Sequence, residues 1–144
     1  MSIFLGGNAS ANELNDYEEG SWTATATGGV DSITYITCRY TKIGRMIQLS
    51  SRFTLSGSSG GGALSVSGLP FQSGAQNQNS FSIMHNGFDE GGSQEPELHG
   101  HIGSSTTTVS FYYTRTNGAN WNQVTGTEAV SHEIIWATTY YTDL

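Results

Sequence analysis

The chain has 144 residues, a net charge of −7 and five Lys and Arg residues, and only 12% of its residues are charged. This length suits one domain, and five cations are too few to neutralise a phosphate backbone, which argues against nucleic acid and an anionic membrane surface as partners. Because Cys38 is the single cysteine, no disulfide can form within the chain, and no apolar run approaches the ~18 residues that cross a bilayer.

Residues 1–15 are expected to form a short extended arm, followed by a single β-sandwich domain over residues 16–144. Ile3, Phe4 and Leu5 are apolar and precede small and polar residues, so they are candidates for docking the arm onto a larger partner. The alternative is an ordinary frayed terminus. The segment has no basic n-region, and its apolar run is too short for a signal peptide.

Short β-strands are predicted for most of the remaining chain. "NDYEEG" is interpreted as a turn, because Asn and Asp favour Asx turns and Gly tolerates unusual dihedral angles. Beyond it, apolar and polar residues alternate with period two, which indicates strands, and no window shows helical periodicity over three turns. The predicted strands are 22–27, 33–43, 46–55, 63–66, 81–85, 98–103, 106–116 and 132–142.

Strand 46–55 has the clearest alternation, and it should follow strand 33–43 through a hairpin turn at Gly44-Arg45. Residues 56–62 are expected to be a flexible Gly/Ser tip. Cys38 should pack as a small buried hydrophobe. The core face predicted for strand 46–55 consists of Ile47, Leu49, Ser51, Phe53 and Leu55.

Three motifs, in this order along the chain, resemble the β-sandwich modules of tailed-phage virions. These modules occur at the heads of tail fibres and tailspikes and in some capsid-decorating proteins. The likeness extends from Leu14 to the C-terminus, and it departs at Ala24, where the family often has Pro. The matching residues are Asp16, Tyr17, Glu18, Glu19, Gly20 and Trp22 in an acidic motif, Tyr40, Thr41, Lys42, Ile43 and Gly44 in a hairpin, and Gly68, Leu69, Pro70 and Phe71 in an apolar plug.

The resemblance implies a homotrimer, so the expected fold is an all-β, antiparallel β-sandwich that is jelly-roll-like and associates as three copies. Trp136, Tyr140 and Tyr141 on the last strand are the candidate trimer-interface residues. The alternative is that these side chains fill the core of one protomer.

The acidic motif should fix the start of the domain. We expect Tyr17 and Trp22 to pack against the first strands, with aromatic burial dominating the energy. Glu18 and Glu19 should accept hydrogen bonds or pair with basic residues, and exposed pairs of that kind add little. The basic candidates are Arg39, Lys42 and Arg45.

His99 and His101 are the candidates for a metal site. Two residues apart on a strand, they point to the same face, and three such pairs could meet on a trimer axis. Some phage fibres use histidine pairs in this way. The alternative, which the pattern favours, is a pair of solvent-facing or core histidines, so no cofactor is expected.

An acidic loop offers carboxylates but fits no known site. Its acidic residues are Asp89, Glu90, Glu95 and Glu97. Their spacing is not that of an EF-hand, which argues against Ca²⁺. Asp89 with Glu95 or Glu97 could form a carboxylate pair for glycoside hydrolysis, but a chain of this size lacks the long β-helix of depolymerising tailspikes. We therefore expect no enzyme activity.

Two functions remain. The first is a capsid-decorating or cement protein, whose trimer binds the major capsid protein or another virion protein through its arm. The alternative is a receptor-binding tail-fibre head that recognises a host surface glycan or protein. The start at Met1 with a short arm, and the lack of heptad or collagen-like repeats, favour decoration. The expected location is the virion, assembled in the host cytoplasm without a signal peptide.

Overall fold

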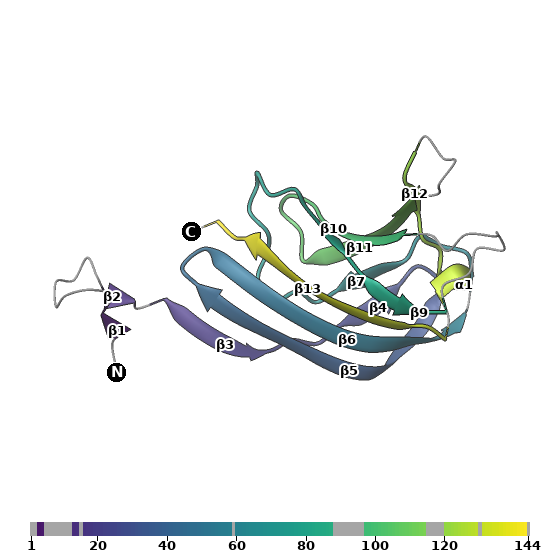
Figure 1. The fold of residues 1–144 in the computed structure, drawn as a ribbon, viewed down its shortest axis with the longest axis horizontal. Coiled ribbons are helices and arrows are strands. Elements are labelled where there is room, and N and C mark those ends of the chain that lie inside the picture. The colour runs from purple at the N-terminus through teal and green to yellow at the C-terminus, as the bar shows by residue number, and fades with distance from the viewer. Residues whose placement is uncertain are drawn as a thin grey trace.

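The computed structural model describes residues 3–4, 13–14, 16–58, 60–87, 97–114, 120–129 and 131–143. These described residues are all-β, with 63% of them in strands and 4% in helix, which confirms the predicted all-β class. Its two large antiparallel sheets face each other as in a β-sandwich (Figure 1). The trimer and the arm are not part of what this single chain shows.

The larger strands belong to two sheets. The β5–β6 sheet has the order β3-β5-β6-β13-β9, and the β10–β11 sheet has the order β4-β7-β11-β10-β8, with β12 also beside β11. The first elements are β1 (Ile3–Phe4), β2 (Glu13–Leu14), β3 (Tyr17–Ser21), β4 (Thr25–Thr27), β5 (Val30–Ile43), β6 (Met46–Ser58) and β7 (Ser65–Ser67). The others are β8 (Asn79–Ser82), β9 (Met84–Asn86), β10 (Glu97–Ile102), β11 (Thr108–Thr114), β12 (Asn122–Gln123), the short helix α1 (Gly126–Ala129) and β13 (Glu133–Tyr141).

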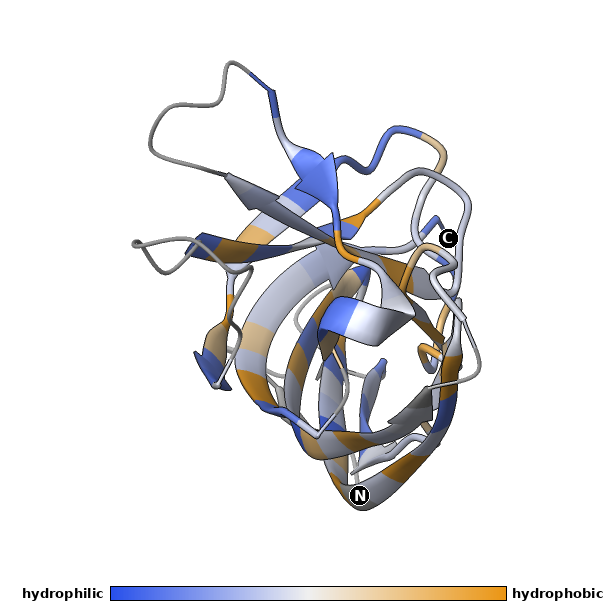
Figure 2. Ribbon diagram, turned by 90° about the vertical axis from the view of Figure 1, so that its right-hand side faces the viewer, coloured by the Kyte–Doolittle hydropathy of each residue, from blue (hydrophilic) through white to orange (hydrophobic). Residues whose placement is uncertain are grey.

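Period-two alternation builds the core between the sheets. Orange and pale bands alternate along the strands in Figure 2, because successive side chains point to opposite faces. The predicted inner face of β6 is confirmed, since every member of it is buried: Ile47, Leu49, Ser51, Phe53 and Leu55. The β10–β11 sheet opposes it with Val66, Leu98, Ile102, Val109 and Phe111. Cys38 is also buried, as expected.

The acidic motif forms a strand where the sequence predicted a turn. Tyr17 pairs with Ile43 and Ser21 with Arg39, so β3 lies along the edge of β5. Turn propensity is a local preference, and the long hairpin offers an open edge whose hydrogen bonds outweigh it. The same pairing principle extends β6 to Ser58, where residues predicted to be a flexible tip face the start of β5.

The predicted strand 22–27 is only half strand, because its first half crosses between the sheets. β3 belongs to the β5–β6 sheet and β4 to the β10–β11 sheet, so residues 22–24 span the gap. Trp22 and Ala24 are buried there, and the Trp22 ring centroid lies 6.2 Å from that of Trp136. A second crossing at the buried Ile83 divides the predicted strand 81–85 into β8 and β9.

The apolar plug forms as predicted. Leu69 is buried, and the Phe71 ring meets the Tyr40 ring edge-on with centroids 5.5 Å apart. The Tyr140 hydroxyl donates a hydrogen bond to the Phe71 carbonyl at 2.7 Å. Gly68 has φ of 97°, and a Cβ there would lie 2.1 Å from the Thr23 carbonyl oxygen, so the turn before the plug requires glycine.

Replacing Trp22 with Ala should reduce the free energy of unfolding by about 3–5 kcal/mol, because it opens a cavity beside Trp136. Glu18→Gln should cost far less, since Glu18 accepts its hydrogen bond from Tyr40 at an exposed site. Urea denaturation of both variants measures the difference. Equal, small losses would contradict a central role for the Trp22 ring.

Candidate binding surfaces

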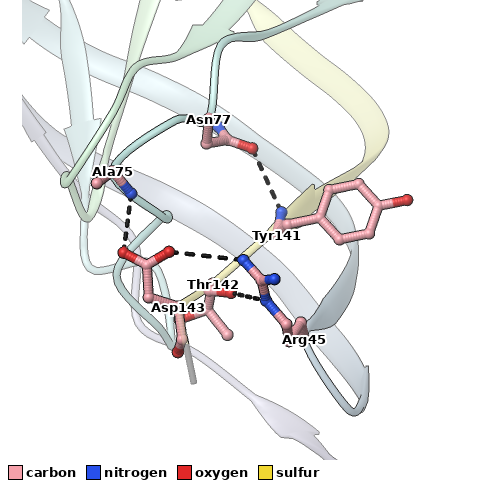
Figure 3. A network of polar contacts seen from close by, with 6 residues as sticks. All are labelled: Arg45, Ala75, Asn77, Tyr141, Thr142 and Asp143. Atoms are coloured by element: carbon pink, nitrogen blue, oxygen red, sulfur yellow. Dashed lines mark hydrogen bonds and ion pairs between the residues drawn. The ribbon is translucent and has the colours of Figure 1, made fainter.

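A network of polar contacts ties the end of the chain to the β5–β6 turn (Figure 3). The Arg45 Nε donates to the Thr142 carbonyl at 2.9 Å, and its guanidinium lies 3.6 Å from the Asp143 carboxylate. The other carboxylate oxygen of Asp143 accepts a hydrogen bond from the Ala75 N–H at 2.9 Å. Asp143 therefore joins the turn, the C-terminal segment and the loop before β8.

A shallow groove of about 320 Å³ opens beside this network, at the low end of the size of small-molecule sites. Asn77, in the lining of the groove, accepts a hydrogen bond from the Tyr141 N–H at 3.3 Å, which holds that side of the groove in place. The Tyr141 ring points away from the network in Figure 3. The groove is lined by Arg45, Gly74, Gln76, Asn77, Gln78, Tyr141 and Asp143.

A second surface lies on the outer face of the β10–β11 sheet. The Trp121 ring centroid is 5.6 Å from that of Tyr112, which is 6.1 Å from that of His101. We call Trp121, Tyr112 and His101 the aromatic row. Sequence reasoning missed it, although a Trp within the polar segment "NGANWNQ" is a signal that could have found it, because such a ring has no apolar neighbours in sequence to bury it.

A third surface is an apolar row on the outer face of the β5–β6 sheet. Directly opposite residues in an antiparallel ladder share a face. Tyr17 pairs with Ile43, Ile43 with Met46, and Met46 with Tyr141, so one line of side chains crosses four strands. Tyr17, Ile43 and Tyr141 are exposed. We call Tyr17, Ile43, Met46 and Tyr141 the apolar row.

Glu18 and Glu19 accept hydrogen bonds, which is one of the two expected alternatives, whereas the basic residue Lys42 pairs with Asp16 and with neither glutamate. Tyr40 donates to Glu18, and the Tyr17 hydroxyl donates to Glu19 at 2.7 Å. These bonds to carboxylates raise the pKa of both Tyr17 and Tyr40. Trp22 packs inward as expected, whereas Tyr17 remains exposed on the outer face.

The three interface candidates divide between core and surface. Trp136 and Tyr140 are buried in the core of the single chain, because both point inward from β13, and this leaves them no surface for a second copy. Tyr141, the next residue along the strand, is 55% exposed. Only Tyr141 therefore stays available as a trimer-interface residue.

His99 and His101 lie on one face of β10, and each has a polar neighbour. His99 Nε2 is 3.8 Å from a Glu97 carboxylate oxygen, and His101 Nε2 is 2.9 Å from Gln78 Oε1. Within the described ranges, no three His, Cys, Asp or Glu side chains gather in a group that could hold a metal. Binding on a trimer axis stays a prediction.

Several predicted residues fall beyond these surfaces. Asp89, Glu90 and Glu95 of the acidic loop, and Leu5 of the arm, lie outside the described residues. Ile3 and Phe4 form β1, which pairs with β2. The single helix in the described ranges, α1, has four residues, far fewer than a membrane span requires.

Comparison with known proteins adds no relative. A scan against protein-family models, a search of curated proteins and a search of solved structures each find no match to this chain.

Stability should fall at alkaline pH because of Tyr140. Burial raises its pKa to about 12, against 10.0 in the unfolded chain, although the bond to the Phe71 carbonyl partly opposes this. Below pH ~10 the phenol is protonated in both states, and between ~10 and ~12 only the unfolded state ionises, so unfolding becomes more favourable as pH rises. Urea titrations across this range measure the slope.

Tyr140→Phe supplies the control. The variant should lose about 0.5–1.5 kcal/mol at neutral pH with the hydrogen bond to Phe71. Its stability should then decline less steeply than that of the wild type above pH ~10. Parallel curves for the two proteins would contradict the assignment to Tyr140.

Proposed function

We propose that this chain is a non-enzymatic structural protein of a tailed-phage virion, a trimeric and jelly-roll-like module that decorates the capsid and stabilises the shell through its N-terminal arm. The resemblance of three motifs to phage β-sandwich modules supports this family. Each motif forms a distinct feature of the fold. The acidic motif forms β3 along the edge of β5, the second motif forms the β5–β6 hairpin, and the apolar plug ends at Phe71, whose carbonyl accepts a hydrogen bond from Tyr140.

The apolar row is the observation that carries the proposal. Three exposed side chains and the half-buried Met46 lie in line on the outside of the sheet, and such an apolar strip is of the kind that marks contacts between proteins. Tyr17 and Ile43 lie at the end of the sheet that leads to β1 and β2, which pair with each other and with neither large sheet (Figure 1). A contact between copies here would bring the arms of the trimer together on one side.

The trimer would bind the shell tightly because its three arms contact several capsid subunits at once. Each arm can bind weakly, because linking the arms raises their effective concentration at the shell. The polar network around Asp143 fits such a static role, since it fastens the C-terminal segment beside the apolar row.

Ile43→Lys should convert the trimer to monomers without unfolding the chain, because it places a charge in the middle of the apolar row. Met84→Lys is the matched control, since Met84 is an exposed apolar residue on β9, at the opposite edge of the same sheet. Light scattering gives the mass of each protein, and circular dichroism checks folding. A monomeric wild type, or a trimer that survives Ile43→Lys, would refute the interface.

Removal of residues 1–10 should leave a folded trimer that no longer binds shells assembled from the major capsid protein. The reason is that this removes the apolar residues Ile3, Phe4 and Leu5 and leaves the strands from β3 onward intact. Co-sedimentation with shells measures binding. A Gly/Ser segment of equal length in place of residues 1–10 controls for chain length. Full binding by either altered protein would show that the arm has no docking role.

The second candidate function, recognition of a host surface, is favoured by the aromatic row. A mostly exposed Trp ring beside an outward-facing Tyr is a surface that suits ligand contact. The chemistry of that surface decides which ligand it fits.

A further inference from the structure

Trp121 differs from the other two tryptophans of the chain. Its side chain is 70% exposed, against 7% for Trp22 and 4% for Trp136. Burying an aromatic ring contributes about 1.5–3 kcal/mol, so a ligand that covers the exposed ring of Trp121 would gain binding free energy of that order. Its neighbours Tyr112 and His101 continue the aromatic row across β11 and β10.

Uncharged hydrogen-bonding groups surround the aromatic row. Gln123 pairs with Tyr112, and Ser110 and Ser80 pair with His101, so their side chains share its face. The described strands of the β10–β11 sheet contain no Lys or Arg, and Glu97, at one end of β10, is their one acidic residue. The surface is therefore neutral, aromatic and rich in hydroxyl and amide groups.

One amide beside the row is held in place. Gln78 Oε1 lies 2.9 Å from His101 Nε2, and Gln78 Nε2 donates to Ser104 Oγ at 3.0 Å. Because both polar atoms of the Gln78 amide are already hydrogen-bonded, the side chain loses little conformational entropy when a ligand binds. Gln78 also lines the groove of about 320 Å³, so the aromatic row and the groove adjoin at this residue.

We propose that the outer face of the β10–β11 sheet binds a neutral oligosaccharide, with sugar rings on Trp121 and Tyr112 and the chain continuing past Gln78 toward the groove. A pyranose has an apolar C–H face that stacks on an aromatic ring, and hydroxyl groups at its rim that pair with amides and hydroxyls. An anionic glycan is disfavoured, because the described strands of this sheet offer no Lys or Arg, Arg45 in the groove is paired with Asp143, and the net charge is −7.

The inference rests on the recognition candidate and specifies its ligand class. It can be tested separately from the decorating function, since the aromatic row lies on the other sheet and neither Ile43 nor residues 1–10 line the groove, although Tyr141 belongs both to the apolar row and to the groove. Ile43→Lys and the removal of residues 1–10 should therefore leave oligosaccharide binding unchanged, which separates a failure of one proposal from a failure of the other.

The test uses the full chain and four soluble probes: cello-, malto-, chito- and mannohexaose. Acrylamide quenching of tryptophan fluorescence reports on Trp121, because Trp22 and Trp136 are buried. At least one probe should protect Trp121 from quenching, with a Kd that changes less than about twofold between low and high salt. Trp121→Ala should weaken binding by about tenfold or more, measured by calorimetry.

Met84→Ala is the matched control, since Met84 is an exposed apolar residue on β9 of the other sheet, and it should bind like the wild type. The proposal is overturned if none of the four probes binds at up to about 10 mM. It is equally overturned if Trp121→Ala binds as tightly as the wild type, or if a charged polysaccharide binds better than every neutral probe.

Discussion

The continuous pairing of β5 with β6 is the constraint on which the rest of the structure depends. The ladder runs from Ile43 opposite Met46 to Val30 opposite Ser58, with one irregularity near Tyr35. Its register sends Ile47, Leu49, Phe53 and Leu55 of β6 inward, and a slip by one residue would turn these four side chains to solvent. The edge of β5 then receives β3, and the edge of β6 receives β13.

The sequence predicted those parts of the fold in which local pattern and final environment agree. The inner face of β6, the turn at Gly44-Arg45, the buried Cys38 and the plug at Leu69 are of this kind. The sequence-based prediction was wrong at Tyr17–Ser21, where strand pairing outweighed the local turn propensity. It was also wrong at Ile83, where the chain crosses between the sheets and one predicted strand becomes two. Neither event leaves a periodic signal in a single strand.

The binding surfaces were harder to predict, because each combines residues that are distant in sequence. The apolar row needs the register of four strands, and the Asp143 network needs the end of β13 to lie beside the β5–β6 turn. The predicted interface residues show the difficulty. Successive side chains of a strand point to opposite faces of the sheet, so Tyr140 is in the core while Tyr141 is exposed.

The position of β13 has a consequence for synthesis on the ribosome. This strand lies between β6 and β9, so the β5–β6 sheet is complete only after residues 133–141 have emerged. Until then the backbone N–H and C=O groups along this edge of β6 have no partner strand, and they can pair with another nascent chain. Translation speed between residues 58 and 133, and any chaperone that covers this edge, should therefore govern the yield of correctly folded protein.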